Sequence, residues 1–227
     1  MHPEAPRRLR RAEAVLAARR RQMTLVLENV IDPHNMSAVL RTCEAFGLQD
    51  VHLVTEGTAS TEPNPDVALG AERWLTLHRH VSAAAGIAAL RARGYRLYVG
   101  HLSADAIPLC ELPRDQRAAY VFGSERTGVT PTWLDAADAR FLIPTCGFTG
   151  SLNLSVAAAL VVYDRLCVQA ARAAATGDLS ESEKVALRAV WYETLAHGSA
   201  ALARDFAARL PDPPAPAPTF PIDRRKT

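Results

Sequence analysis

Short apolar runs alternate with longer amphipathic or alanine-rich segments between residues 25 and 175, and turn-forming glycine, proline or asparagine residues separate them. Short apolar runs bounded by turn residues are typical of buried strands, whereas longer periodic segments are typical of helices. The pattern predicts strands at residues 25–27, 51–54, 74–78, 95–99, 118–122 and 141–143, and helices at residues 36–46, 83–93 and 153–175. Strands that alternate with helices indicate an α/β fold with a mostly parallel sheet.

Residues 25–47 join the first strand to an amphipathic helix through a turn at residues 32–35. Asn35 is expected to cap this helix, which should stop at Gly47. The helix is predicted to have two faces, with Val39, Cys43 and Phe46 on the packed one and Ser37, Arg41 and Glu44 on the polar one. Most exposed arginines contact only water, so Arg41 becomes a candidate functional residue only through the segments described below.

The positive charge of the chain is concentrated at its start. The net charge of all 227 residues is +2, but residues 1–22 hold seven arginines and two glutamates, which gives +5 there and −3 elsewhere. Residues 3–21 are predicted to form a basic helix with few apolar contacts, at Leu9, Val15 and Leu16. This helix is either a solvated surface element or an arm that grips phosphates. Repulsion between the arginines favours the arm, and its candidate phosphate contacts are Arg8, Arg11, Arg19 and Arg20.

The composition changes again after Gly177. Ser180 and Glu183 have the spacing of a capping box, and helices are predicted from there to about residue 194 and over residues 200–210. Residues 211–227 are rich in proline and are expected to be an extended or disordered tail. The chain therefore divides into segments 1–22, 23–175, 176–210 and 211–227.

The overall composition, with 48% hydrophobic and 22% charged residues, is ordinary for a globular protein. The four cysteines lie far apart without a CxxC pair, which argues against a zinc site or a disulfide framework and suits the reducing cytoplasm. No apolar run approaches the ~20 residues of a membrane span, and the start lacks the apolar segment of a secretory signal. We expect no metal and no membrane partner.

Three loops that follow predicted strands are rich in glycine or asparagine and should lie at the carboxyl edge of the sheet, where open α/β folds bind ligands. They contain Asn35 with Arg41, residues 123–128, and residues 147–153. The second loop lacks the lysine of a P-loop, and the chain has neither a GxGxxG nor a GxSxG motif. The glycines therefore favour a ligand held by backbone groups, although simple turns would need them equally.

These loops carry three motifs that resemble, in the same order, the signature motifs of the SpoU class of SPOUT RNA methyltransferases. The resemblance covers roughly residues 23–170 and is highly specific as a set. Its residues are Glu28-Asn29-Val30, Asn35-Met36-Ser37-Ala38 and Arg41-Thr42, then Phe122-Gly123-Ser124-Glu125-Arg126-Thr127-Gly128-Val129, and finally Ile143-Pro144 with Gly150-Ser151-Leu152-Asn153-Leu154-Ser155-Val156-Ala157. Within the class, the short basic start, Pro33-His34-Asn35 and the helical extension are most similar to the TrmH group of tRNA (guanosine-2'-O)-methyltransferases.

The resemblance implies a SPOUT fold in residues 23–175 with a deep C-terminal trefoil knot, flanked by helical extensions at both ends. It also implies a homodimer that binds S-adenosylmethionine, held largely by backbone groups at Gly100, Gly123, Ile143 and Leu152. The polar motif positions, expected to be catalytic, are Arg41, Asn35, Glu125, Ser151 and Asn153. Gly100 is a mild departure, because members of the class often have threonine before the His-Leu pair.

The implied activity is methylation of the ribose 2'-hydroxyl of the D-loop guanosine at position 18 of tRNA. Arg41 could bind the neighbouring phosphate and orient the nucleophile, or accept the hydroxyl proton if its surroundings lower a pKa that ordinarily exceeds about 12. Ser151 and Asn153 could instead only cap the helix that follows them. Phe148 is either a stacking surface for a base or a core aromatic residue.

Two other functions remain open. The same fold could methylate ribosomal RNA, although such enzymes often have a separate N-terminal RNA-binding domain, for which some 22 upstream residues leave no room. The chain could also be a catalytically silent RNA-binding protein, against which the intact motif residues argue.

Overall fold

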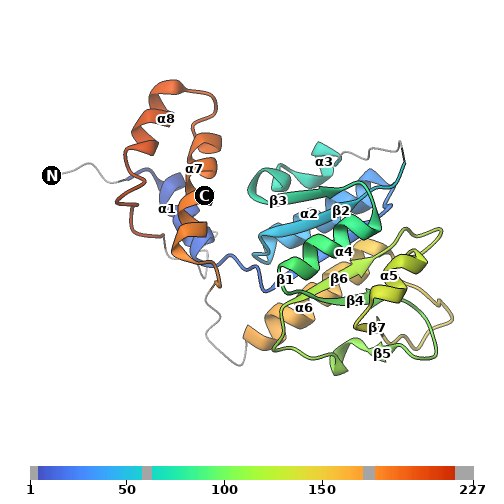
Figure 1. Cartoon of the computed structure of the whole chain (residues 1–227). Helices are drawn as coiled ribbons and strands as arrows, with labels where there is room; N and C mark the ends of the chain where they lie inside the picture. Colours follow the sequence, from blue (N-terminus) through green and yellow to red (C-terminus); the bar gives the residue numbers. More distant parts are fainter. Residues whose placement is uncertain (1–4, 58–62, 171–176, 218–227) are drawn as a thin grey trace. The chain divides into compact units, whose positions relative to one another are not determined.

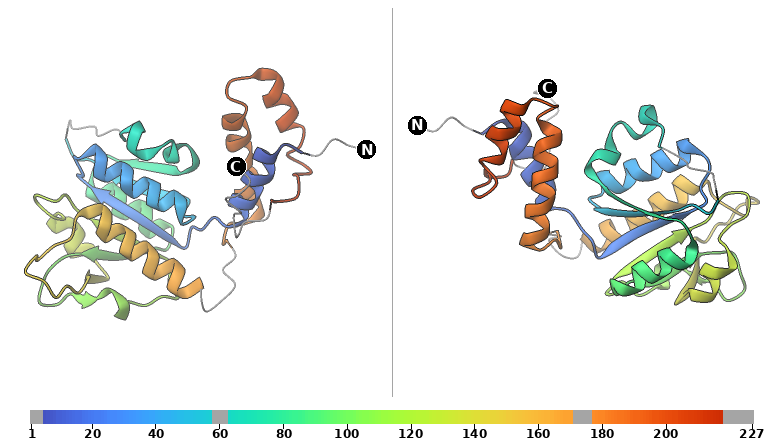
Figure 2. Two further views of the ribbon diagram at one scale, coloured as in Figure 1. Left: turned by 180° about the vertical axis from the view of Figure 1, so that it is seen from behind. Right: turned by 45° about the horizontal axis from the view of Figure 1, so that its top comes forward.

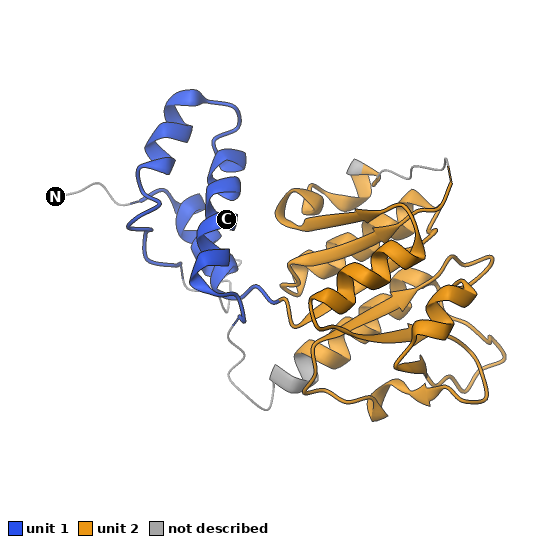
Figure 3. Ribbon diagram, in the orientation of Figure 1, with its two compact units in different colours: residues 1–20, 176–227 blue, residues 21–175 orange. Residues whose placement is uncertain are grey.

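The computed structural model describes residues 5–57, 63–170 and 177–217, and the chain forms two compact units (Figures 1 and 3). One unit comprises residues 21–175, and the other joins residues 1–20 to residues 176–227. The sequence pattern predicts the two ends of the chain as separate segments. The structure instead groups them in one unit.

The larger unit is built on a seven-stranded sheet in which every pair of neighbouring strands is parallel. The order across the sheet is β3-β2-β1-β6-β4-β7-β5. The strands are β1 Met23–Glu28, β2 Asp50–Val54, β3 Thr76–His80, β4 Arg96–Gly100, β5 Ile107–Pro108, β6 Ala118–Phe122 and β7 Ala139–Leu142. The predicted α/β class and parallel sheet are confirmed, and only the two-residue strand β5 lacks a counterpart among the predicted strands.

Helices cover both faces of this sheet (Figure 2). The central strand β1 is buried at every position, and its side chains alternate between two cores, with Leu25 and Leu27 in one and Val26 in the other. The first core includes side chains of α2 (Pro33–Ala45) and α6 (Leu154–Ala170), and the second those of α4 (Ala83–Ala92) and α5 (Pro131–Ala136). The remaining short helices of this unit are α3 Pro65–Ala68, η1 Ala71–Trp74 and η2 Leu109–Glu111. Burial on both faces explains why the inner strands β1 and β6 are mostly apolar.

Helix α2 begins earlier than predicted, so the expected capping role of Asn35 is wrong. The cap is Asp32, whose Oδ1 accepts a hydrogen bond from the backbone N–H of His34 at 2.8 Å. Asp32 followed by Pro33 is a stronger start signal than Asn35, because proline is favoured in the first helical position. Asn35 therefore lies within the first turn, where its side chain is available for other contacts.

Two further positions on α2 differ from the predicted faces. Ser37 is predicted on the polar face but is fully buried in the structure. Its Oγ accepts a hydrogen bond from the backbone N–H of Asn64 at 2.7 Å. Phe46 was placed on the packed face but is 38% exposed. Val39, Cys43 and Arg41 follow the prediction, the first two buried and the third exposed.

The smaller unit packs α1 (Arg7–Ala17) against α7 (Glu181–Leu195), and α7 against α8 (Ala200–Ala207). Its core contains Leu9, Leu16, Trp191 and Phe206. The buried Glu13 carboxylate accepts hydrogen bonds from Arg188 Nε at 2.8 Å and from the Tyr192 hydroxyl at 2.8 Å. These contacts tie the start of the chain to its C-terminal part.

The C-terminal segments agree in part with the predictions. Ser180 and Glu183 form the predicted capping box at the start of α7. Of the proline-rich tail, residues 211–217 are described, and the backbone N–H of Ala217 donates to the carbonyl of Arg10 at 2.9 Å. The rest of the tail lies outside the described residues. Among the described residues, no helix has the length and apolar character needed to cross a membrane.

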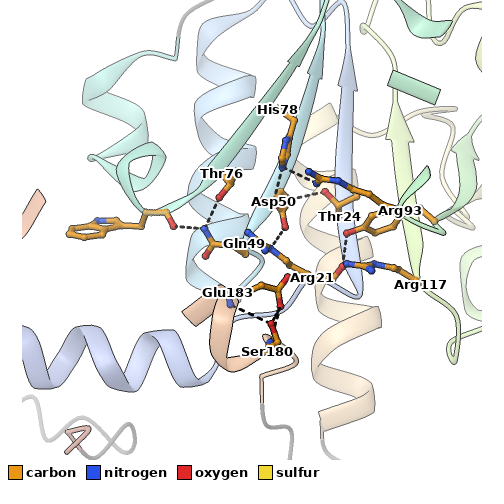
Figure 4. A network of polar contacts seen from close by, with 12 residues as sticks. Arg21, Thr24, Gln49, Asp50, Thr76, His78, Arg93, Arg117, Ser180 and Glu183 are labelled. Carbon is orange, nitrogen blue, oxygen red and sulfur yellow. Dashed lines mark hydrogen bonds and ion pairs between the residues drawn. The ribbon is translucent and has the colours of Figure 1, made fainter. Parts of the chain in front are cut away.

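A buried carboxylate at the start of β2 holds the amino ends of neighbouring strands together (Figure 4). Asp50 is 1% exposed, its Oδ2 lies 2.6 Å from Arg21 Nε, and its Oδ1 lies 2.7 Å from His78 Nε2. Burial alone would raise the pKa of Asp50, but the hydrogen bond with His78 and the charge of Arg21 outweigh it, so this pKa lies below its ordinary value. The ionised form of Asp50 therefore stabilises the fold.

We predict that Asp50→Asn lowers the free energy of unfolding by about 3 kcal/mol at pH 7, because it removes a buried negative charge that is paired with the half-buried Arg21 and with His78. Because the folded state lowers the pKa of Asp50, its contribution is present above the unfolded pKa of about 3.9 and is lost as the pH falls below it. Urea titrations at pH 7 and pH 3.5 should therefore show the difference between wild type and variant shrinking on acidification. The control is Asp115→Asn, which changes an exposed carboxylate; an equal effect of both changes would contradict the prediction.

Candidate functional site

A cleft of about 350 Å³ opens at the carboxyl edge of the sheet, where β4, β6 and β7 end. These strands are neighbours, in the order β6-β4-β7, so the loops that follow them converge (Figure 1). The volume lies in the range of small-molecule sites. The lining residues come from three loops and the start of α6, and they include all four predicted cofactor positions, Gly100, Gly123, Ile143 and Leu152.

Gly123 is required by the close approach of two backbone segments. A Cβ atom built on Gly123 would lie 2.1 Å from the carbonyl group of Gly128 and 2.3 Å from the backbone nitrogen of Val129. No side chain fits in this space, so the loop after β6 presents main-chain groups to the cleft. By contrast, a Cβ on Gly100 would meet Phe141 and the Val121 carbonyl at 3.4 Å, which is tight but not prohibitive.

The loop at residues 123–128 is closed by its own hydrogen bonds. The N–H of Gly128 donates to the carbonyl of Ser124 at 2.9 Å, and Ser124 Oγ lies 2.8 Å from Thr127 Oγ1. Gly128 has a φ of 67°, a conformation that glycine adopts without strain. Ser124 is therefore occupied in shaping the loop, whereas the exposed Glu125 lines the cleft.

A chain of side-chain hydrogen bonds connects the three predicted loops. Asn35 Nδ2 donates to Glu125 Oε1, and Asn153 Nδ2 donates to Asn35 Oδ1 at 3.0 Å. Asn153 also caps α6, because its Oδ1 accepts from the backbone N–H of Ser155 at 2.9 Å. The two roles considered for Asn153, helix capping and membership of a polar site, are thus combined in one side chain.

Ser151 lines the cleft, as predicted for a polar motif residue. Phe148, on the same loop, has a relative exposure of 110%, which excludes the core position considered for it. Among the described residues, no three histidine, cysteine, aspartate or glutamate side chains are grouped so that they could hold a metal ion.

Glu28 belongs to the first motif, but its structural role is not predicted from the sequence. Its carboxylate is fully buried at the end of β1 and accepts hydrogen bonds from the backbone N–H of Thr130 at 2.8 Å and its hydroxyl at 2.7 Å. Burial raises the pKa of Glu28, against the opposing effect of these bonds. Glu28 anchors the end of the loop that carries Gly123 and Glu125. A charged residue ending an otherwise apolar strand was the available signal.

Arg41 is exposed on α2 and is not among the residues that line the cleft. It follows Asn35 by six residues, a rise of about 9 Å along the helix. Within one chain the structure therefore brings together Asn35, Glu125 and Asn153, but does not bring Arg41 to the cleft wall.

A second depression lies between α2 and α6. It has a volume of about 370 Å³ and is lined by Ala38, Thr42, Phe46, Ser155, Val156, Ala159, Leu160 and Tyr163. Several of its apolar side chains are unusually accessible, with Val156 48% and Tyr163 56% exposed. Contiguous exposed apolar surface of this kind marks an interaction site more often than a random feature.

The four predicted phosphate contacts on the basic helix have different surroundings. Arg11 is exposed, as a phosphate contact should be. Arg8 is half-buried, donates to the Leu195 carbonyl at 3.3 Å and lies over the Phe206 ring. Arg19 is fully buried with its guanidinium 5.1 Å from the ring centroid of Trp191, so assigning it to phosphate is wrong in this structure. Arg20 is partly exposed just beyond the helix.

Comparison with known proteins gives a consistent picture. The sequence profile of the SpoU rRNA Methylase family matches residues 22–163. A protein of Borreliella burgdorferi named tRNA (guanosine(18)-2'-O)-methyltransferase is 38% identical over 182 residues, covering 80% of this chain and 83% of that protein. An Escherichia coli protein of the same name is 34% identical over 159 residues, covering 70% and 69%.

Among solved structures, the crystal structure of the A. aeolicus TrmH/SpoU tRNA modifying enzyme is similar to this chain with a TM-score of 0.74. The sequence identity is 27%, and the match covers 83% of this chain and 95% of that one.

We predict that Gly123→Ala weakens binding of S-adenosylmethionine at least tenfold, because the added methyl group must displace the backbone at Gly128. Isothermal titration calorimetry measures the affinity directly. Gly147→Ala is the matched control, since its Cβ would have no neighbour closer than 3.9 Å. Wild-type affinity in the Gly123 variant would show that the loop does not contact the ligand.

Proposed function

This chain belongs to the SpoU rRNA Methylase family, and we propose that it transfers the methyl group of S-adenosylmethionine to the ribose 2'-hydroxyl of guanosine 18 in tRNA. The observation that carries the proposal is the hydrogen-bonded chain Glu125–Asn35–Asn153 beside a cleft walled by Gly123. The relatives at 34–38% identity carry the name of this activity, which favours tRNA over ribosomal RNA as the substrate.

The cleft suits S-adenosylmethionine because its walls combine backbone groups with apolar side chains. Gly100 and Gly123 leave main-chain donors and acceptors accessible to an adenine or a ribose, while Ile143 and Leu152 supply apolar surface. Glu125 brings a negative charge to the same cleft and can balance a cationic ligand. When bound, S-adenosylmethionine supplies an electrophilic methyl group on a sulfonium.

The protein must then place the 2'-oxygen in line with that methyl group and provide a route for the hydroxyl proton. Proximity and orientation supply much of the acceleration in such a transfer. In our proposal Arg41 binds the phosphate next to the target ribose through its two-pronged guanidinium and so orients the oxygen. The proton passes to a phosphate oxygen or to water. Asn35 and Asn153 hold Glu125 in place at the cleft wall.

We further propose that the working enzyme is a homodimer in which Arg41 of one protomer completes the cleft of its partner. The apolar depression between α2 and α6 supports this arrangement, because its exposed side chains suit a self-complementary contact about a two-fold axis. Arg41 lies on α2 between Ala38 and Thr42, which line that depression, and it is absent from the cleft of its own chain. A cleft completed by Arg41 of the partner protomer would account for both the exposed surface and the absence of Arg41 from its own cleft.

The trefoil knot that the resemblance implies is also part of the proposal. Supporting it, Arg165 on α6 is 4% exposed and reaches into the segment between β5 and β6. Its guanidinium donates to the carbonyl of Leu112 at 3.0 Å and to the carbonyl of Leu109. These bonds fasten the C-terminal helix of the larger unit to a loop through which a knotted chain would pass.

We assign tRNA binding to the smaller unit. We also propose that the protein acts in the cytoplasm. Arg7 and Arg11 are exposed one helical turn apart on α1, so both can meet phosphates. The opposite face of α1 is committed to packing through Leu9, Glu13 and Leu16. Only the exposed arginines of the basic segment are thus available for RNA.

We predict that Arg41→Ala lowers kcat for methylation of a tRNA transcript by about a hundredfold or more while S-adenosylmethionine affinity is unchanged, because a transition-state contact is lost. Methyl incorporation from labelled donor measures the rate, and mapping of the product identifies the nucleotide. Arg73→Ala, another exposed arginine, is the control. Full activity of the Arg41 variant would refute its role, and methylation of ribosomal RNA alone would refute the substrate.

Mixed dimers distinguish a shared site from a separate one. An Arg41→Ala protomer paired with a Gly123→Ala protomer has one intact site if Arg41 acts across the interface, and none if it acts within its own chain. We expect the mixed dimer to regain about half of wild-type turnover, as two-fold symmetry requires.

We predict that Arg7→Ala with Arg11→Ala weakens tRNA binding and reduces the slope of log K against log salt by about one to two. Filter binding at several salt concentrations checks this, with Arg73→Ala as the control. The substitutions lie on the exposed face of α1 and leave Leu9 and Leu16 in the core, so folding should be unaffected. An unchanged slope would exclude this helix from the RNA interface.

A further inference from the structure

One large aromatic side chain of the larger unit, that of Phe148, is fully exposed to solvent. Phe148 has a relative exposure of 110% and lies in the loop between β7 and α6. The same loop contributes Thr145, Gly150 and Ser151 to the lining of the cleft. Phe148 therefore lies in a loop whose residues on either side of it line the cleft.

Packing gives no reason for a phenylalanine at this position. The aromatic residues of the cleft wall, Phe122 and Phe141, are 6% and 2% exposed and meet edge to face at 6.0 Å. Phe148 buries no surface against the described part of its own chain, so an apolar ring there gains nothing for folding. A ring of this kind is explained by a ligand that covers it.

The proposed reaction supplies such a ligand. A ribose whose 2'-oxygen enters the cleft carries its base with it, and a base inside a folded RNA must first leave its stacking partners. Exposed aromatic rings are the usual replacement partner for an unstacked base, because every base has a π face. An exposed ring on a loop that lines the proposed donor site is well placed to meet the base attached to the reacting ribose.

We infer that Phe148 is the platform on which the base of the methylated guanosine stacks, and so positions its ribose for transfer. The inference rests on the proposed function and adds to it a residue that acts on the base, whereas the polar residues act on the ribose, phosphate and donor. Its flanking residues Gly147 and Thr149 are small, which leaves both faces of the ring open.

The first test compares Phe148→Leu with Phe148→Tyr in single-turnover methylation of a tRNA transcript. The leucine variant should lose about ten- to a hundredfold in kcat/KM, the range expected for one stacked base, while the tyrosine variant retains the wild-type value within a factor of about two. Affinity for S-adenosylmethionine, measured by calorimetry, should be unchanged in both. Because Phe148 is fully exposed, neither change should disturb folding.

A substrate with an abasic ribose at position 18 isolates the stacking contact. Phe148→Leu should weaken binding of the intact transcript but alter binding of the abasic transcript by less than about twofold, because the two changes remove the same contact. An equal loss on both transcripts would overturn the inference. So would a weakened donor affinity, which would place the adenine of the donor on the ring, or a shift from dimer to monomer in sedimentation, which would place the partner protomer there.

Wild-type protein with intact transcript separates this inference from the proposed function. If the wild type does not methylate position 18, the function itself fails. If it does so and Phe148→Leu is equally active, only the stacking role fails.

Discussion

The side chain of Asn35 holds together loops that follow different strands of the sheet. Its amide nitrogen donates to Glu125 in the loop after β6, and its amide oxygen accepts from Asn153, which caps α6. An amide is suited to this place because it donates and accepts at once, whereas a carboxylate could only accept. Removing it would leave Glu125 without this donor and Asn153 without this acceptor.

The rest of the site depends on backbone geometry more than on side chains. Gly123 packs against the main chain at Gly128, and Glu28 fixes the far end of the same loop through Thr130. Parallel strands at the centre of the sheet supply the rigid base, since their carboxyl ends lie side by side in the order β1-β6-β4-β7. A cleft built mainly from backbone packed in this way is preorganised, and preorganisation lowers the free-energy cost of binding a ligand.

The sequence pattern was sufficient for the sheet and for the three loops at its carboxyl edge, because apolar runs indicate burial and glycine-rich segments indicate turns. The individual residues proposed to bind the donor came from the resemblance to the SpoU class. The pattern failed where a stronger local signal competed, as at Asp32-Pro33, which displaced Asn35 from the helix cap. It also failed where contacts are distant along the chain. Glu13 and Arg188 are 175 residues apart, and no periodicity indicates that they meet. The sequence pattern likewise cannot indicate which residues would contact Arg41 in the proposed dimer.

The arginines also differ in how deeply they are buried, which a count of charges does not show. Arg19, Arg165 and Arg188 are at most 6% exposed, where they contact an aromatic ring, backbone carbonyls or a carboxylate. Desolvating such groups would be costly without those partners, so they are committed to the fold and unavailable to RNA. The basic segment at the start of the chain therefore forms a helix whose two faces have different roles. One face joins the start of the chain to α7, and the other keeps its charge in solvent, where a phosphate backbone can reach it.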